Sequence, residues 1–371
     1  MGEKWAVKSI SNLSSYFSQT IENDLAIPDL IFDNLFKVTG FNPRGLPMNI
    51  KKTLGILAPK IRMLKAQRIR QLEMNAAQKR GMIQSQELNQ EIYQAIINSS
   101  PFLAGKIGSN ELLVTIWYLK WRQWSRLWTR LSYKKLEPLE KVAGIFPRSP
   151  ESYERFASAY IQALGEMDYF GVWHNEAEIK LVSKFAPQAK IGKVFGLEPY
   201  LSAHTPWTLA LAGKKVLVVT PFAKTMTQQF GNLDKIWVNY ETQKQHLLIP
   251  RDTQFQVMRF PYGFDPAVQQ QYGGWENLLE EMMTQISNQT FDLAILGCGG
   301  FSLLVGAKIK KMGASAIHLG GATQILFGIQ GDRWNTKPWF MEQVNEYWTH
   351  PLPEDSPADD VKQRCENACY W

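Results

Sequence analysis

Short apolar segments alternate with helix-type segments along the last two thirds of the chain. The segments "DYFGVWHNEAEI" (168–179), "KKVLVVTPFAKTMTQQF" (214–230), "QVMRFPYG" (256–263) and "FDLAILGCGG" (291–300) each contain an apolar run that ends in Gly, Pro or polar residues. Such runs indicate buried strands, and strands that alternate with helices indicate a parallel sheet. We therefore expect an α/β fold with a doubly wound, mainly parallel, Rossmann-like sheet.

The polar pattern divides the chain into three regions. We expect residues 1–95 to form a helical N-terminal extension, because a polar helical pattern runs from about Pro59 to Ile97. A short apolar strand and a Gly-Ser-Asn turn then begin the main domain, which we place at 96–335. The remaining residues, 336–371, are rich in Pro, Glu and Asp and end in Tyr-Trp, so we expect a tail that packs on or near the site.

Composition narrows the possible partners and the compartment. A chain of 371 residues with 45% hydrophobic content buries a large core, and the excess of 41 Lys+Arg over 34 Asp+Glu favours phosphate-bearing or anionic partners. This charge is too small to predict a nucleic-acid partner. Three cysteines are too few for a disulfide framework, which favours the cytoplasm. We find no signal-peptide pattern and no apolar run long enough to span a membrane, so we expect peripheral membrane contact at most.

A glycine turn follows the strand "LAIL". Gly297, Gly299 and Gly300 precede a helical segment, where backbone N–H groups can bind a phosphate. The dinucleotide fingerprint requires a third glycine where this chain has Ser302, and an acidic residue where the next strand ends in His318. Only 74 residues (371 − 297) follow the turn, which is too few for a dinucleotide-binding or methyltransferase domain. The alternative interpretation is a tight turn that serves only packing.

Two strand exits carry the candidate catalytic side chains. His318, followed by Gly320 and Gly321, can donate a hydrogen bond to a phosphate or carry a proton near neutral pH, or it can be structural. Glu111 follows Ser109–Asn110 at a strand-to-helix turn, near the positive end of the helix dipole. Its carboxylate can hold a divalent cation or accept a proton from a hydroxyl, or it can simply complement the dipole.

Further strand exits and loops offer weaker candidates. Thr220, Lys224 and Thr225 follow a strand and suit phosphate or sugar hydroxyls, although an ordinary capped helix gives the same pattern. Glu198 and His204 lie in loops and carry little weight alone. The two C-terminal cysteines, with one nearby histidine, have inadequate number and spacing for a zinc site.

One predicted helix has an aromatic stripe with a basic stripe beside it. The stripes consist of Trp117, Trp121, Trp124 and Trp128, and of Arg122, Arg126 and Arg130. The favoured interpretation is a core stripe with a solvated basic flank. The alternative is an interfacial surface that touches anionic lipid headgroups or a lipid-linked acceptor.

Several motifs together resemble a known family. "GKIGSNEL", "GKKVLVVTPF", "FDLAILGCGG", "AIHLGGATQILFGIQGDRW" and the terminal "CYW" resemble bacterial GT-D fold glycosyltransferase-like proteins over about residues 103–371. The resemblance implies a GT-D-like fold and transfer of a sugar from a nucleoside diphosphate, such as UDP, to a hydroxyl of a glycan or lipid-linked glycan. The Asp-x-Glu motif of the family corresponds to Ser109–Glu111, so its aspartate is missing and only Glu111 matches. The late strand exit of the family corresponds to His318–Gly321, where the acidic position is not acidic.

The resemblance also implies roles for individual residues. Glu111 and His318 are the expected catalytic residues, and Glu111 would hold Mn²⁺ or Mg²⁺ if the enzyme uses a metal. The expected nucleotide-sugar-binding residues are Lys106, Gly108, Ser109, Asn110, Thr220, Lys224, Thr225, Gly297, Gly299, Gly300, Gly320, Gly321 and Arg333. Two alternatives stay open: an NAD or S-adenosylmethionine enzyme, and a non-catalytic nucleotide- or glycan-binding protein. We expect a cytoplasmic protein, with contact at the inner membrane face as a further option.

Overall fold

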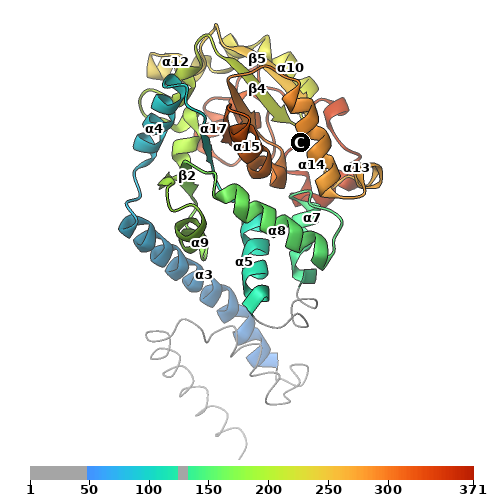
Figure 1. Cartoon of the computed structure of the whole chain (residues 1–371). Coiled ribbons are helices and arrows are strands. Elements are labelled where there is room, and N and C mark those ends of the chain that lie inside the picture. Colours follow the sequence, from blue (N-terminus) through green and yellow to red (C-terminus); the bar gives the residue numbers. More distant parts are fainter. Residues whose placement is uncertain (1–47, 124–132) are drawn as a thin grey trace, which may run out of the picture. The chain divides into compact units, whose positions relative to one another are not determined.

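A computed structural model of the chain describes residues 48–123 and 133–371 (Figure 1). The chain divides into two units, Met1–Gln67 and Arg68–Trp371, and every strand of the described residues belongs to the second unit. Of the predicted N-terminal helical region, residues 1–47 lie outside the described residues. The first described helix, α3 (Met48–Lys79), crosses the boundary between the two units.

Seven strands form one sheet in which every pairing is parallel. The strands are β1 (Leu103–Gly105), β2 (Tyr169–Val172), β3 (Lys190–Lys193), β4 (Lys215–Thr220), β5 (Gln254–Arg259), β6 (Leu293–Leu296) and β7 (Ser315–His318). Their order across the sheet is β3-β2-β1-β7-β6-β4-β5. The expected α/β class with a parallel, Rossmann-like sheet is therefore confirmed.

The central strands are apolar on both faces, which explains why they read as continuous apolar runs. Along β4, Val216 and Val218 belong to one hydrophobic core, whereas Leu217 and Val219 belong to the other. Successive side chains of a strand point to opposite faces, and a parallel sheet is covered by helices on both faces. The strand therefore separates two cores.

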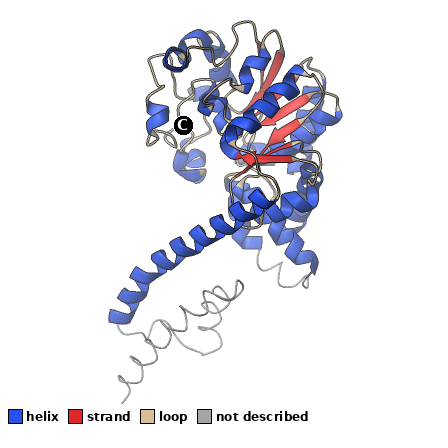
Figure 2. Cartoon of the chain, turned by 90° about the vertical axis from the view of Figure 1, so that its left-hand side faces the viewer, coloured by secondary structure: helices blue, strands red, loops and turns tan. Residues whose placement is uncertain are grey.

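Helices cover both faces of the sheet (Figure 2). The first core packs against α5 (Ser109–Gln123), α7 (Glu137–Lys141), α8 (Pro150–Leu164), α9 (Glu178–Phe185), α13 (Pro266–Tyr272), α14 (Trp275–Ser287) and α15 (Ser302–Lys311). The second core packs against α4 (Ser85–Ile97), α10 (Ala223–Phe230), α11 (Leu233–Ile236), α12 (Val238–Lys244), α16 (Ala322–Leu326) and α17 (Pro338–Met341). The last helix is α18 (Asp359–Arg364).

The structure differs from the sequence-based expectation in two elements. Strand β3, "KIGK", lies at the edge of the sheet, and its two lysines conceal it in the hydrophobic pattern. The predicted pattern from Pro59 to Ile97 is two helices, α3 and α4, separated by a turn. Because α4 buries Leu88 and Ile92 in the second core, the sheet-containing unit starts well before residue 96.

Candidate functional site

The connections after β4 and β6 run to opposite faces of the sheet. The helix that follows β4, α10, packs in the second core, and the helix that follows β6, α15, packs in the first. Because β4 and β6 are neighbours, the two segments that leave their carboxyl ends diverge toward opposite faces, and a crevice lies between them. Open parallel sheets bind ligands at such topological switch points.

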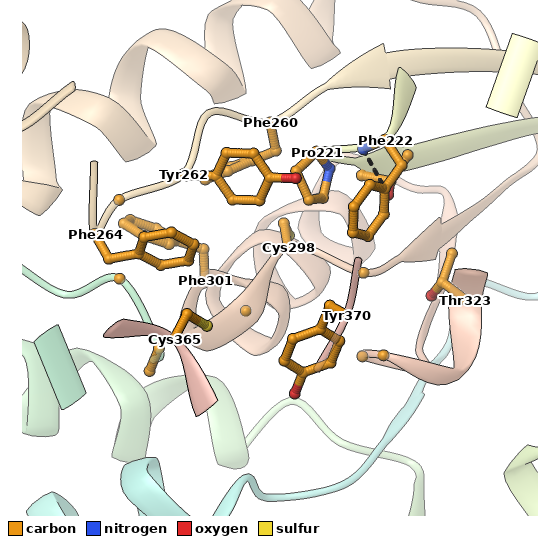
Figure 3. Close-up of a pocket in the computed structure, with 18 of the residues that line it drawn as sticks. Pro221, Phe222, Phe260, Tyr262, Phe264, Cys298, Phe301, Thr323, Cys365 and Tyr370 are labelled. Carbon is orange, nitrogen blue, oxygen red and sulfur yellow. Dashed lines mark hydrogen bonds between the residues drawn. The ribbon is translucent and has the colours of Figure 1, made fainter. Parts of the chain in front are cut away.

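A cavity of about 120 Å³ lies at this switch point (Figure 3). The segments that follow β4, β5, β6 and β7 form its walls, and many of the lining side chains are aromatic. The aromatic lining consists of Phe222, Phe260, Tyr262, Phe264, Phe301, Tyr370 and Trp371. Gly297, Gly299, Gly320 and Gly321 also line the cavity, as does Thr220 at the end of β4. Five of the expected binding residues therefore share one cavity with an aromatic wall.

The C-terminal tail closes one side of the cavity. Figure 3 shows Tyr370 and Cys365 opposite the rings that follow β5. The Gln324 side chain donates to the Tyr370 carbonyl at 3.2 Å, and the ring of Trp371 lies 5.7 Å from that of Tyr262. Arg333 donates to Glu366 at 2.7 Å and also to the Tyr370 hydroxyl. The tail thus lies at the carboxyl edge of the sheet and engages Arg333 there.

Glu111 lies in the first turn of α5 and reaches across to the glycine turn. A Cβ on Gly108 would lie 2.1 Å from one oxygen of the Glu111 carboxylate, and a Cβ on Gly300 would lie 3.1 Å from the other. The carboxylate therefore fits between two glycines that are 192 residues apart (300 − 108). Burial raises the pKa of Glu111 to about 7, and the charge of Glu366 contributes to the rise. A carboxyl group that titrates near pH 7 suits proton transfer at neutral pH.

Three backbone N–H groups of the glycine turn donate hydrogen bonds to other groups of the protein. Gly297 donates to the Val219 carbonyl at 2.9 Å, and Gly300 donates to the Ala143 carbonyl at 3.0 Å. The N–H of Cys298 donates to the Ser302 hydroxyl at 3.1 Å, so the residue that replaces the third glycine of the fingerprint stabilises the turn. These N–H groups are thus satisfied within the protein, unlike the phosphate-binding arrangement that the sequence suggested.

His318 and Lys106 lie side by side at the ends of β7 and β1. Burial, with a smaller contribution from the charge of Lys106, lowers the pKa of His318 to about 3. The imidazole is therefore neutral at physiological pH and suits a hydrogen-bonding role better than proton transfer. Its Nδ1 is buried without a hydrogen-bond partner among the described residues. Lys106 itself lies 3.9 Å from a carboxylate oxygen of Glu198.

The start of α10 is occupied by the protein's own carboxylate. Asp355 is fully buried and accepts hydrogen bonds from the N–H of Lys224 at 3.2 Å and from the N–H of Thr225 at 2.6 Å. The Thr225 hydroxyl also donates to it, at 2.7 Å. The Lys224 ammonium is exposed and faces Glu354 at 3.9 Å. Lys224 and Thr225 therefore act as a capped helix start, which was the alternative interpretation of this pattern.

The described residues offer few ligands to a metal ion. Within 48–123 and 133–371, no group of three or more His, Cys, Asp or Glu side chains is placed to hold one. Ser109 and Asn110 precede Glu111, so this turn carries one acidic side chain. The described residues around Glu111 therefore do not form a group of three or more such metal ligands.

The aromatic stripe is only partly described. Trp117 is buried in the first core, which agrees with the core interpretation for this residue. The side chains of Trp121, Trp124 and Trp128 lie outside the described part. Among the described helices, none is both long and apolar enough to cross a bilayer.

Comparison with known proteins adds no identification. No protein-family model, no curated protein and no solved structure matches the chain. The fold and the site geometry are therefore the basis for assigning a function.

Some residues of this edge were not found by sequence reasoning. Asp355 gave no signal, because it acts on Thr225 across 130 residues. Tyr262 lies in segment 256–263, which was recognised only as a strand and turn, and Phe264 comes directly after that segment. Trp173 follows β2 in a loop that was recognised only as polar. Aromatic residues within about five positions of a strand end were the available signal for Trp173, Tyr262 and Phe264.

Proposed function

We propose that the protein is a glycosyltransferase that moves a sugar from a nucleoside diphosphate to a hydroxyl of a glycan or lipid-linked glycan acceptor. The observation that carries this proposal is the position of Glu111 between Gly108 and Gly300. This arrangement brings a carboxyl group with a pKa of about 7 to the carboxyl edge of a parallel sheet, near an aromatic cavity. The resemblance to GT-D proteins supports the same reaction.

The donor end of the crevice has features that suit a nucleoside diphosphate. Planar rings such as Tyr262 and Phe222 can stack on a nucleobase. Two cations, Lys106 and Arg333, lie near each other. Burial has the largest effect in lowering the pKa of the Lys106 ammonium, and the positive charge of the Arg333 guanidinium also lowers it. A departing diphosphate develops negative charge, which positioned cations stabilise.

The acceptor hydroxyl requires a base as the new glycosidic bond forms. In the proposed reaction the hydroxyl oxygen attacks the anomeric carbon, the bond from that carbon to the diphosphate breaks, and the hydroxyl proton passes to the Glu111 carboxylate. Because the pKa of Glu111 is near 7, a large fraction of this group is ionised at physiological pH and can accept the proton. His318, neutral and with a free Nδ1, serves as a hydrogen-bonding group.

Ligand-induced thermal shift tests the donor class. We expect UDP, GDP or their sugars to raise the melting temperature, because a ligand that binds only the folded state stabilises it. The control ligands are NADH and S-adenosylmethionine. Stabilisation by either of these, and by none of the nucleoside diphosphates, would contradict the proposal and favour the alternative enzyme class.

Substitution of Glu111 tests the chemical step. Glu111→Gln should lower transfer by roughly two orders of magnitude or more while nucleotide binding persists, as expected when a proton acceptor is lost. The matched control is Glu241→Gln, which changes another carboxyl group whose pKa burial raises, on α12. Equal activity of both variants and the wild type would remove Glu111 from the mechanism. Nucleotide binding with no transfer to any acceptor would favour the non-catalytic alternative.

A further inference from the structure

Two exposed aromatic rings lie on the other half of the carboxyl edge, after β2 and β3. Trp173 is 39% exposed and Phe195 is 51% exposed, and no other Trp or Phe of the described residues is exposed to this degree. Their rings meet edge to face, with centroids 6.3 Å apart and an interplanar angle of 78°. Large rings left in water at a ligand-binding edge indicate a contact surface.

The loop that carries Trp173 is held in a fixed conformation. The buried carboxylate of Glu178 accepts hydrogen bonds from the N–H of Trp173 at 3.1 Å and from the N–H of Asn175 at 2.9 Å. Two residues of this loop, His174 and Ala177, have left-handed φ angles of 63° and 65°. Such conformations cost on the order of 1 kcal/mol each, and they occur at functional sites where surrounding contacts maintain them.

A second carboxylate fixes the other end of the same loop. Glu73, on α3, accepts hydrogen bonds from the N–H of Ala177 at 2.7 Å and from the N–H of Ile179 at 3.0 Å. With Glu178, it secures the backbone on both sides of His174. The exposed position of Trp173 is therefore imposed by the surrounding hydrogen bonds.

Hydrogen-bonding groups lie beside these rings. The Lys106 ammonium is 5.0 Å from the centroid of the Trp173 ring and 3.9 Å from Glu198, whose other carboxylate oxygen accepts a hydrogen bond from Tyr200 at 3.1 Å. Aromatic faces attract the weakly positive C–H groups of a sugar ring, and charged side chains bind its hydroxyls. This combination suits a saccharide.

The rings and the aromatic cavity belong to one continuous edge. Lys106 follows β1, which pairs with β2 and β7, and a Cβ on Gly320 would lie 3.7 Å from the Lys106 side chain. Gly320 also lines the cavity. A ligand bound at Trp173 and a ligand bound in the cavity would therefore approach each other at the β1–β7 junction, close to His318 and Lys106.

We propose that Trp173 and Phe195 form a saccharide platform that binds a sugar ring of the acceptor, while the aromatic cavity takes the nucleotide. The acceptor role rests on the proposed glycosyltransferase function. The binding of a saccharide at these two rings does not depend on that function and is tested separately.

Saturation-transfer NMR with the methyl glycosides of glucose, galactose, mannose and N-acetylglucosamine tests the platform. We expect the wild type to bind at least one of them, and Trp173→Ala and Phe195→Ala to weaken that binding at least tenfold. Phe195→Tyr keeps an aromatic ring and should bind within about threefold of the wild type. The control is Met312→Ala, an exposed apolar side chain that precedes β7 at the opposite edge of the sheet.

Nucleotide binding by the same variants separates the two proposals. Trp173→Ala and Phe195→Ala should bind the nucleoside diphosphate within about twofold of the wild type, since their rings do not line the cavity. Absence of saturation transfer in the wild type, or equal transfer in all variants, would overturn the platform. Saccharide binding without nucleotide binding would support the platform and overturn the proposed function.

Discussion

At the scale of single residues, the burial of Glu111 makes stability depend on pH. Burial raises its pKa from 4.5 to about 7, so the folded protein binds this proton more tightly than the unfolded chain does. The resulting stabilisation is fully present below pH 4.5 and is lost as the pH rises through 7. The carboxyl group of Glu178 changes stability with pH in the same direction, because burial also raises its pKa to about 7.

The substitution Glu111→Gln should therefore increasingly stabilise the folded protein, relative to the wild type, as the pH rises. We expect the free energy of unfolding of the variant, relative to the wild type, to increase between pH 4.5 and pH 8 by up to roughly 3 kcal/mol, since each pKa unit corresponds to about 1.4 kcal/mol. Urea denaturation at both pH values measures it. Glu178 is unchanged in this comparison, so its contribution cancels. A difference that is constant with pH would show that Glu111 titrates normally.

Gly108 tests whether the position of the Glu111 carboxylate matters. A Cβ at residue 108 would lie 2.1 Å from a carboxylate oxygen, and the flexible side chain of Glu111 would have to move. We expect Gly108→Ala to lower transfer at least tenfold with a melting temperature within a few degrees of the wild type. The control is Gly231→Ala, where the nearest atom, the Gln228 carbonyl oxygen, is 3.5 Å away. Full activity of Gly108→Ala would mean that the carboxylate need not lie in this gap.

At the scale of elements, the start of α10 depends on a residue far along the chain. Asp355 satisfies the N–H groups of Lys224 and Thr225, which an isolated helix would leave open. Because it is fully buried, Asp355→Ala should lower the free energy of unfolding by about 2–3 kcal/mol. Chemical denaturation measures this loss.

Asp265 provides the matched control for that helix cap. It caps α13 with one hydrogen bond to the N–H of Ala267 at 2.9 Å, and it is only half-buried. Asp265→Ala should therefore cost about 1 kcal/mol, the ordinary value for an N-cap. If both variants lost equal stability, Asp355 would be an ordinary cap rather than a link between the tail and the sheet.

Elements differed in how well the sequence predicted them. The strands β4 and β6 were predicted because they are buried on both faces and read as apolar runs. The edge strand β3 was missed because two of its four residues are lysines. Helix α4 was assigned to an N-terminal extension, although its Leu88 and Ile92 contact the core. A short or partly exposed element has too few regularly spaced apolar residues for the sequence to show what it packs against.

At the scale of the whole molecule, the strand order creates one crevice whose walls come from four strand exits. Nucleotide binding should slow amide hydrogen exchange in the segments after β4, β6 and β7 (220–223, 297–300 and 319–321) and in the tail (365–371). The physical reason is that a bound ligand stabilises the segments that it contacts. Exchange at the amino edge of the sheet should not change.

Hydrogen–deuterium exchange with and without UDP or GDP measures this pattern. Segment 288–292, which leads into β6 at the amino edge, is the internal control. Protection confined to that segment, with none at the strand exits or the tail, would place the nucleotide outside the switch-point crevice.

The amino-acid sequence by itself determined the local units: buried strands, glycine turns, helix starts and the alternation that defines a parallel α/β sheet. These features depend on neighbouring residues, so periodicity and turn chemistry reveal them. Only the tertiary structure decided the order β3-β2-β1-β7-β6-β4-β5, the position of Glu111 beside Gly300 and the cap of α10 by Asp355. The β1–β7 pairing, the approach of Glu111 to Gly300 and the Asp355 cap each join residues more than a hundred positions apart, and packing of the whole chain brings them together.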